Sequence, residues 1–148
     1  MLITASGLVD APAENVYGFL SQLHNHRLIS GDRLHLVSLA ADREGAQIVI
    51  RGPLGIRRTA ETTITQRKPA RGVGGTATVG SRTAAHVHWT IIPTGTGSHI
   101  ALTATILRTG VLDRLLLALG GNRWLARGFD RAIQRLAAVL YEPVTPGH

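Results

Sequence analysis

The hydrophobic period of this sequence changes sharply at Gly110, and that change restricts the possible folds more than any other feature. Between Arg33 and Leu107, apolar and polar residues alternate, which is typical of strands that bury one face. Short Gly- and Pro-containing turn signals divide this stretch, and connections of this length join antiparallel neighbours. The predicted strands are 33–41, 46–52, 56–67, 71–80, 83–92 and 98–108.

A strand and two short helices are predicted before this region. Residues 2–10 alternate loosely and lead into the helix-start signals of Asp10-Ala11-Pro12-Ala13-Glu14. Val16, Phe19 and Leu20 then recur at helical spacing, so one face of this first helix is expected to be buried. A short second helical turn is expected around Leu28.

After Gly110 the apolar residues recur at steps of three and four, which predicts helix. Gly120-Gly121 is expected to divide it into a short helix, about 111–119, and a longer one, about 122–141, because glycine weakens a helix interior. The length of 148 residues fits one domain, predicted over residues 1–142, with a disordered tail over 143–148.

Composition excludes several functional classes. The chain has no cysteine, which excludes disulfides, thiolate nucleophiles and cysteine metal sites. The N-terminal residues lack the pattern of an export signal and no apolar run is long enough to span a bilayer, so a cytoplasmic location is expected. The net charge of +7 favours anionic partners, but with only 4% aromatic residues to stack on bases, nucleic acid is an unlikely one.

Three segments match one family in their order and spacing. Ala11-Pro12-Ala13-Glu14-Asn15-Val16-Tyr17-Gly18-Phe19-Leu20 resembles an opening helix of the form Ala-Pro-x-x-x-Val-[aromatic]-x-x-Leu. Residues 64–71 are similar to a mid-chain strand that ends in a Pro turn, and residues 88–97 are similar to a Trp-x-[aliphatic]-x-Pro-x-x-x-Gly segment. The chain thus resembles the START, birch-pollen-allergen and polyketide-cyclase (SRPBCC) superfamily.

The resemblance implies an α+β helix-grip fold, in which a curved antiparallel sheet wraps around a long C-terminal helix. It also implies binding or transport of a hydrophobic small molecule, such as a lipid or polyketide, in a cavity between sheet and helix. One alternative is a polyketide cyclase or dehydratase-like enzyme, and a second is a basic module at a membrane or nucleic-acid surface. No cofactor is expected.

The cavity lining follows from strand alternation if Trp89 faces the helix. Its strand then presents aliphatic side chains on the same side, as does the next strand, although an ordinary collapsed core would show the same pattern. The residues predicted to bind ligand are Ile64, Ala85, Val87, Trp89, Ile91, Ile100, Leu102, Ala104, Leu112 and Leu116.

Three polar side chains are weak candidates for catalysis. His24 and His26 lie in the break after the first helix, near the cavity mouth in folds of this type, and imidazole titrates near neutrality as a general base must. The alternative is an ordinary loop histidine. Arg58 shares a face with Ile64 and is expected to reach the cavity or its mouth, where it would pair an acidic or enolate oxygen.

Two charged or polar groups are expected on the surface. His86, His88 and His99 lie on the face opposite Trp89, and we predict a solvated face there and not a zinc site. Arginines repeat every four residues along the last helix and form a ridge suited to an anionic membrane surface, or simply to solubility. They are Arg123, Arg127, Arg131 and Arg135.

Overall fold

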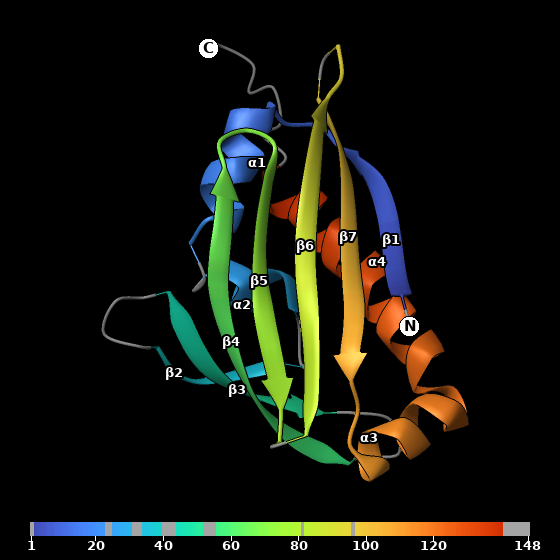
Figure 1. Cartoon of the computed structure of the whole chain (residues 1–148). Coiled ribbons are helices and arrows are strands. Elements are labelled where there is room, and N and C mark those ends of the chain that lie inside the picture. The colour runs from blue at the N-terminus through green and yellow to red at the C-terminus, as the bar shows by residue number, and fades with distance from the viewer. Residues whose placement is uncertain are drawn as a thin grey trace.

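One curved antiparallel sheet and a long C-terminal helix form the body of the molecule (Figure 1). The computed structural model describes residues 2–22, 25–30, 34–39, 44–51, 56–80, 82–95 and 97–140, and within these ranges seven strands form a single sheet. The strand order is β1-β7-β6-β5-β4-β3-β2, and every neighbouring pair is antiparallel. The predicted α+β helix-grip architecture is therefore confirmed.

The strand boundaries agree with those predicted from hydrophobic alternation to within two residues. The strands are β1 (Leu2–Val9), β2 (Leu34–Leu39), β3 (Gly45–Arg51), β4 (Arg57–Lys68), β5 (Gly72–Val79), β6 (Thr83–Pro93) and β7 (Ser98–Arg108). The helices are α1 (Ala13–Leu20), α2 (His26–Ser30), α3 (Val111–Leu116) and α4 (Asn122–Leu140). His24 and the tail 143–148 lie outside the described residues.

The packed core lies where α1 and α4 cover the β1-β7-β6 side of the sheet. Val16 and Leu20 of α1 and Leu136 of α4 are fully buried there, together with Ile100 of β7. Gly7 of β1 allows the close approach of α4, because a Cβ atom at this position would lie 2.9 Å from Ile133 Cγ2. The long helix is thus held firmly against one side of the sheet.

The C-terminal helix breaks at the predicted position. Residues Leu117–Gly121 form a kink between α3 and α4, in which the backbone of Leu119 and Gly120 is not helical. Gly120 has φ of +108°, in the region that favours glycine. The break turns α3 away from the axis of α4, so that α3 lies under the lower end of the sheet (Figure 1). Among the helices that the structure describes, none is long and apolar enough to cross a membrane.

Replacing Gly120 with alanine is expected to lower the free energy of unfolding by about 1–2 kcal/mol, the cost of a left-handed backbone for an L-residue. Gly120→Asn should cost less, because asparagine tolerates this conformation. Thermal unfolding of both variants checks the order. A Gly120→Ala protein that melts above the parent would show that the break is not held in this conformation.

Candidate functional site

A cavity of about 370 Å³ lies between the concave face of the sheet and the helices that cross it. Strands β3 to β7 supply one wall, and α2, α3, the kink at Leu117–Gly121 and α4 supply the other. The C-terminal part of α4 belongs to the packed core through Ile133 and Leu136, whereas its N-terminal part lines the cavity through Trp124, Leu125 and Phe129. The cavity therefore occupies the part of the concave face that α4 does not fill.

Seven of the ten residues predicted as ligand-binding line this cavity. They are Ile64, Ala85, Val87, Trp89, Leu102, Ala104 and Leu116. Ile91 and Ile100 lie on the same face of the sheet as these seven residues. They form the cross-strand pair next to Trp89 and Leu102 on that face, toward the hairpin turn, and are buried in the packed core. Leu112 is exposed and borders a separate surface hollow.

Several lining residues were not predicted as such. Ala46, Ile48 and Ile50 of β3 alternate at steps of two and face the cavity, as do Trp124 and Phe129 of α4. The alternation of β3 and the apolar stripe of α4 are visible in the sequence. These two patterns do not show that β3 and the first turns of α4 line the same cavity, because that depends on the curvature of the sheet.

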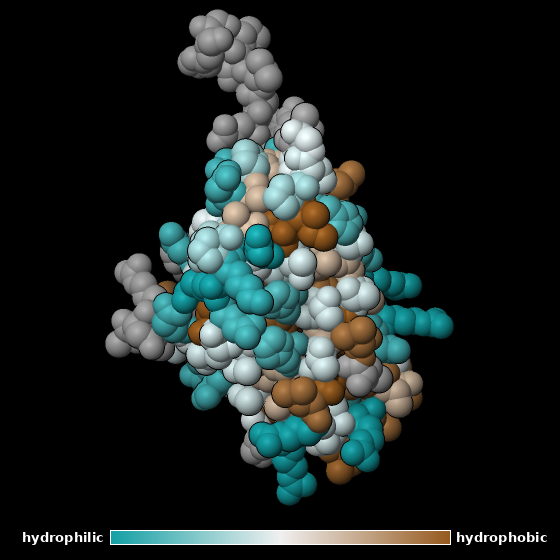
Figure 2. All heavy atoms as spheres, turned by 45° about the horizontal axis from the view of Figure 1, so that its top comes forward, coloured by the Kyte–Doolittle hydropathy of each residue, from teal (hydrophilic) through white to brown (hydrophobic). Residues whose placement is uncertain are grey.

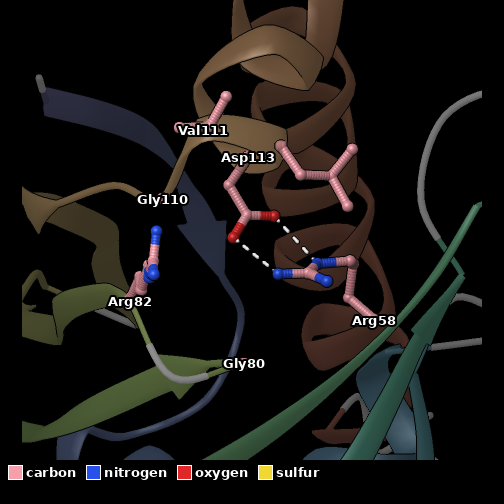
Figure 3. A pocket seen from close by; sticks show the side chains of 7 residues that line it. Arg58, Gly80, Arg82, Gly110, Val111 and Asp113 are labelled. Carbon is pink, nitrogen blue, oxygen red and sulfur yellow. Dashed lines mark hydrogen bonds and ion pairs between the residues drawn. The ribbon is translucent and has the colours of Figure 1, made fainter.

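One end of the cavity carries a partly buried ion pair that joins the sheet to α3 (Figure 3). Arg58 of β4 donates from Nε to Oδ1 of Asp113 and from a terminal nitrogen to Oδ2, each at 2.9 Å. The hydroxyl of Thr83 also donates to Asp113 Oδ2, and the Gly110 amide donates to Thr83 Oγ1 at 3.0 Å. Asp113 is only 8% exposed, so this network replaces the water that its carboxylate has lost.

Arg58 thus faces the cavity, on the strand face predicted for it, but its partner is a residue that the sequence analysis missed. Asp113 is the one acidic residue between Glu61 and Asp130, and it interrupts the apolar helix pattern after Gly110. A lone carboxylate in such a pattern is a signal for a buried partner. The pairing with Arg58 itself needs the fold, because the two residues are 55 positions apart.

The ion pair separates the cavity from a surface hollow of about 310 Å³. Arg58 and Asp113 border both spaces (Figure 3). The other residues that line the hollow are Gly80, Arg82, Gly110, Val111 and Leu112. The pair is therefore the thin part of the wall at this end of the cavity.

His26 lies at the other end of the cavity. Its Nε2 is 2.7 Å from the carbonyl oxygen of Leu20, and its ring makes a T-shaped contact with the ring of Trp89 at a centroid distance of 6.3 Å. Trp89 and Thr83 are six positions apart on β6, or about 20 Å of extended strand. The histidine and the Arg58–Asp113 pair are thus too far apart to act on one atom of a ligand.

The outer-face histidines do not converge. His86 and His88 stack at 6.4 Å, but the strand register sets His99 opposite Ile92, at the far end of the hairpin. Burial lowers the pKa of His88, and the neighbouring His86 and Lys68 lower that pKa further. Within the described residues no group of three or more His, Cys, Asp or Glu side chains is arranged to hold a metal.

Comparison with known proteins assigns the family. Residues 2–141 match the family described as polyketide cyclase / dehydrase and lipid transport, a match that covers nearly the whole chain. The chain belongs to this family. The sequence matches no curated protein.

Solved structures similar to this polyketide cyclase and lipid transport family member support its fold. Protein CV1439 from Chromobacterium violaceum has a TM-score of 0.72 at 13% identity, over 96% of this chain and 99% of that one. TTHA0849 from Thermus thermophilus has a TM-score of 0.70 at 16% identity, over 95% and 97%. DynU16, a protein from the dynemicin biosynthetic locus, has a TM-score of 0.61 at 14% identity, and the match covers 94% of this chain and 46% of the DynU16 chain.

Proposed function

We propose that this protein binds a hydrophobic small molecule, of lipid or polyketide type, in the cavity between the sheet and the C-terminal helix. The observation that carries the proposal is the cavity itself. Protein interiors are close-packed and rarely leave room for more than a water molecule, whereas about 370 Å³ falls in the range of small-molecule sites. The family description, which includes lipid transport, points the same way.

The chemistry of the lining supports an apolar ligand with few polar groups. Aliphatic and aromatic side chains dominate the walls, and the ionisable groups lie at two ends, as His26 and as the Arg58–Asp113 pair. The other polar side chains of the lining are the hydroxyls of Thr62, Thr63 and Thr83. Because Asp113 balances the charge of Arg58, this end favours a neutral hydroxyl or carbonyl over a free carboxylate. A ligand would thus be oriented by its ends and held by its apolar body.

A cyclase or dehydratase-like enzyme remains the second candidate, because His26 lines the same cavity and offers an imidazole, a side chain that can act as a general acid or base. Binding is favoured because Arg58, the other polar candidate, already donates two hydrogen bonds to Asp113. Formation of a cyclised product from a linear poly-ketone, lost in His26→Gln while binding is retained, would establish the enzyme instead.

Filling the cavity tests the proposal. Ala85→Phe should weaken binding of Nile red, an uncharged apolar probe, by about tenfold or more, or about 1.4 kcal/mol, while the melting temperature stays near that of the parent. The ring would occupy the empty space, whereas in a packed core it would destabilise the fold by about 1–3 kcal/mol. Tryptophan emission reports the titration, since Trp89 and Trp124 both line the cavity, and Trp124→Phe isolates Trp89.

Ala101→Phe is the matched control, because Ala101 lies on β7 beside Thr90 of β6, on the face away from the cavity. It should leave the affinity for Nile red unchanged. A parent protein that binds no apolar probe would remove both the carrier and the enzyme interpretations.

A further inference from the structure

The outward face of α3 exposes large apolar side chains. Val111 is 76% exposed, Leu115 54% and Leu119, in the segment that follows α3, 65%. These three residues are spaced four apart, so they form one stripe along the same side of the helical segment. Leu112 borders the stripe and is also exposed.

This segment carries large apolar side chains on both of its faces. Asp113, Leu116 and Leu117 point inward and line the cavity, whereas the stripe of Val111, Leu115 and Leu119 points away from it. A surface helix ordinarily carries polar residues on its outer side. A contiguous exposed apolar stripe instead marks a surface that meets a partner or a membrane.

The charges around this stripe have one sign. Arg108, Arg114 and Arg123 are exposed and lie before, within and after the segment. Between Leu107 and Arg127 the one acidic residue is Asp113, whose charge is directed inward to Arg58. Hydrophobic surface lies beside strongly hydrophilic side chains at this lower end of the molecule (Figure 2).

We propose that this end of the protein docks on an anionic lipid bilayer, with the α3 stripe in the headgroup boundary and the flanking arginines on the phosphates. Apolar side chains within a basic surround are the combination that binds such an interface. A second copy of the chain would bring arginines against arginines, so charge complementarity favours the lipid. The docking goes beyond the proposed ligand function and does not depend on it.

Only part of the arginine ridge on α4 belongs to this surface. Arg123 begins α4 beside the break, whereas Arg131 and Arg135 lie about 12 and 18 Å further along the helix at 1.5 Å per residue. Like Arg123, these two arginines are exposed, but they lie away from the apolar stripe. They provide a matched control for charge alone.

Vesicle co-sedimentation of the full chain tests the proposal, with vesicles of phosphatidylcholine alone and of phosphatidylcholine mixed with phosphatidylglycerol. The parent should bind the mixed vesicles, weakly at high salt, and bind pure phosphatidylcholine poorly. Leu115→Gln with Leu119→Gln should weaken binding by roughly tenfold or more. Arg114→Gln with Arg123→Gln should weaken it by about fivefold for each charge removed.

Two control variants test whether binding depends on the α3 end, or on exposed apolar side chains and positive charge anywhere on the protein. Leu8→Thr with Ile92→Thr removes two exposed apolar side chains that flank His99 at the opposite end of the sheet, and should bind as the parent does. Arg131→Gln with Arg135→Gln should lose clearly less affinity than Arg114→Gln with Arg123→Gln. Circular dichroism melts confirm that each variant is folded.

Three results would overturn the proposal. The first is equal loss in both arginine pairs, since net charge and not the α3 end would then decide binding. The second is a dimer in sedimentation velocity that Leu115→Gln with Leu119→Gln dissociates, because a second copy would then cover the stripe. The third is no binding of the folded parent to mixed vesicles. Nile red binding measured on the same samples shows whether the cavity function stands independently.

Discussion

Replacing Asp113 with alanine is expected to lower the free energy of unfolding by roughly 3 kcal/mol. The change leaves the Arg58 guanidinium partly buried at the cavity wall without the carboxylate that accepts its two hydrogen bonds. It also removes the acceptor of the Thr83 hydroxyl. Breaking a buried pair costs about 3–5 kcal/mol, and the lower end applies here because the Arg58 side chain keeps 26% of its exposure.

Urea denaturation of four variants separates the charge from the space that the pair occupies. Arg58→Met with Asp113→Leu should recover most of the loss, since replacing both partners by apolar residues of similar volume is often neutral. Glu44→Gln, which breaks the exposed pair with Arg67, should cost at most about 1 kcal/mol. The loss of stability in Asp113→Asn should be larger than in the double variant and in Glu44→Gln, and smaller than in Asp113→Ala. A double variant as unstable as Asp113→Ala would show that packing, and not the unpaired charge, causes the loss.

Replacing Gly75 with alanine is expected to cost about 3 kcal/mol or more, at the upper end of overpacking effects. Gly75 pairs with Ile64 beside the β-bulge of β4. A Cβ atom there would overlap the carbonyl oxygen of Thr63 and lie 3.1 Å from the Ile64 Cα. Both contacts are with backbone atoms, so the neighbouring strand would have to move.

Gly18→Ala is the control for this substitution. Gly18 lies within α1, and a Cβ atom there would meet nothing within 4 Å. Because alanine is the better helix former, this variant should be more stable than the parent by roughly 0.5–1 kcal/mol. Thermal and urea unfolding of both variants checks the contrast. Equal effects of the two substitutions would mean that β4 and β5 are not held as close as the structure shows.

The hydrophobic period of the sequence determined the elements and their faces. Alternation over 33–107 predicted six strands with nearly their observed boundaries, and it assigned Trp89, Leu102 and Ala104 to one face. Gly120-Gly121 predicted the helix break, because two adjacent glycines weaken any helix. These features depend on residues close in the chain, and local backbone preferences are sufficient to specify them.

The position of the cavity was decided only by the tertiary structure. Ile91 and Val87 lie on the same face of the same strand, yet one is in the packed core and the other lines the cavity. The difference depends on α4, since Ile133 and Leu136 near its C-terminal end belong to the packed core, whereas Trp124 and Leu125 near its N-terminal end line the cavity. The pairing of Arg58 with Asp113 has the same origin: 55 residues separate them, and only the curvature of β4 under α3 brings their charges into contact.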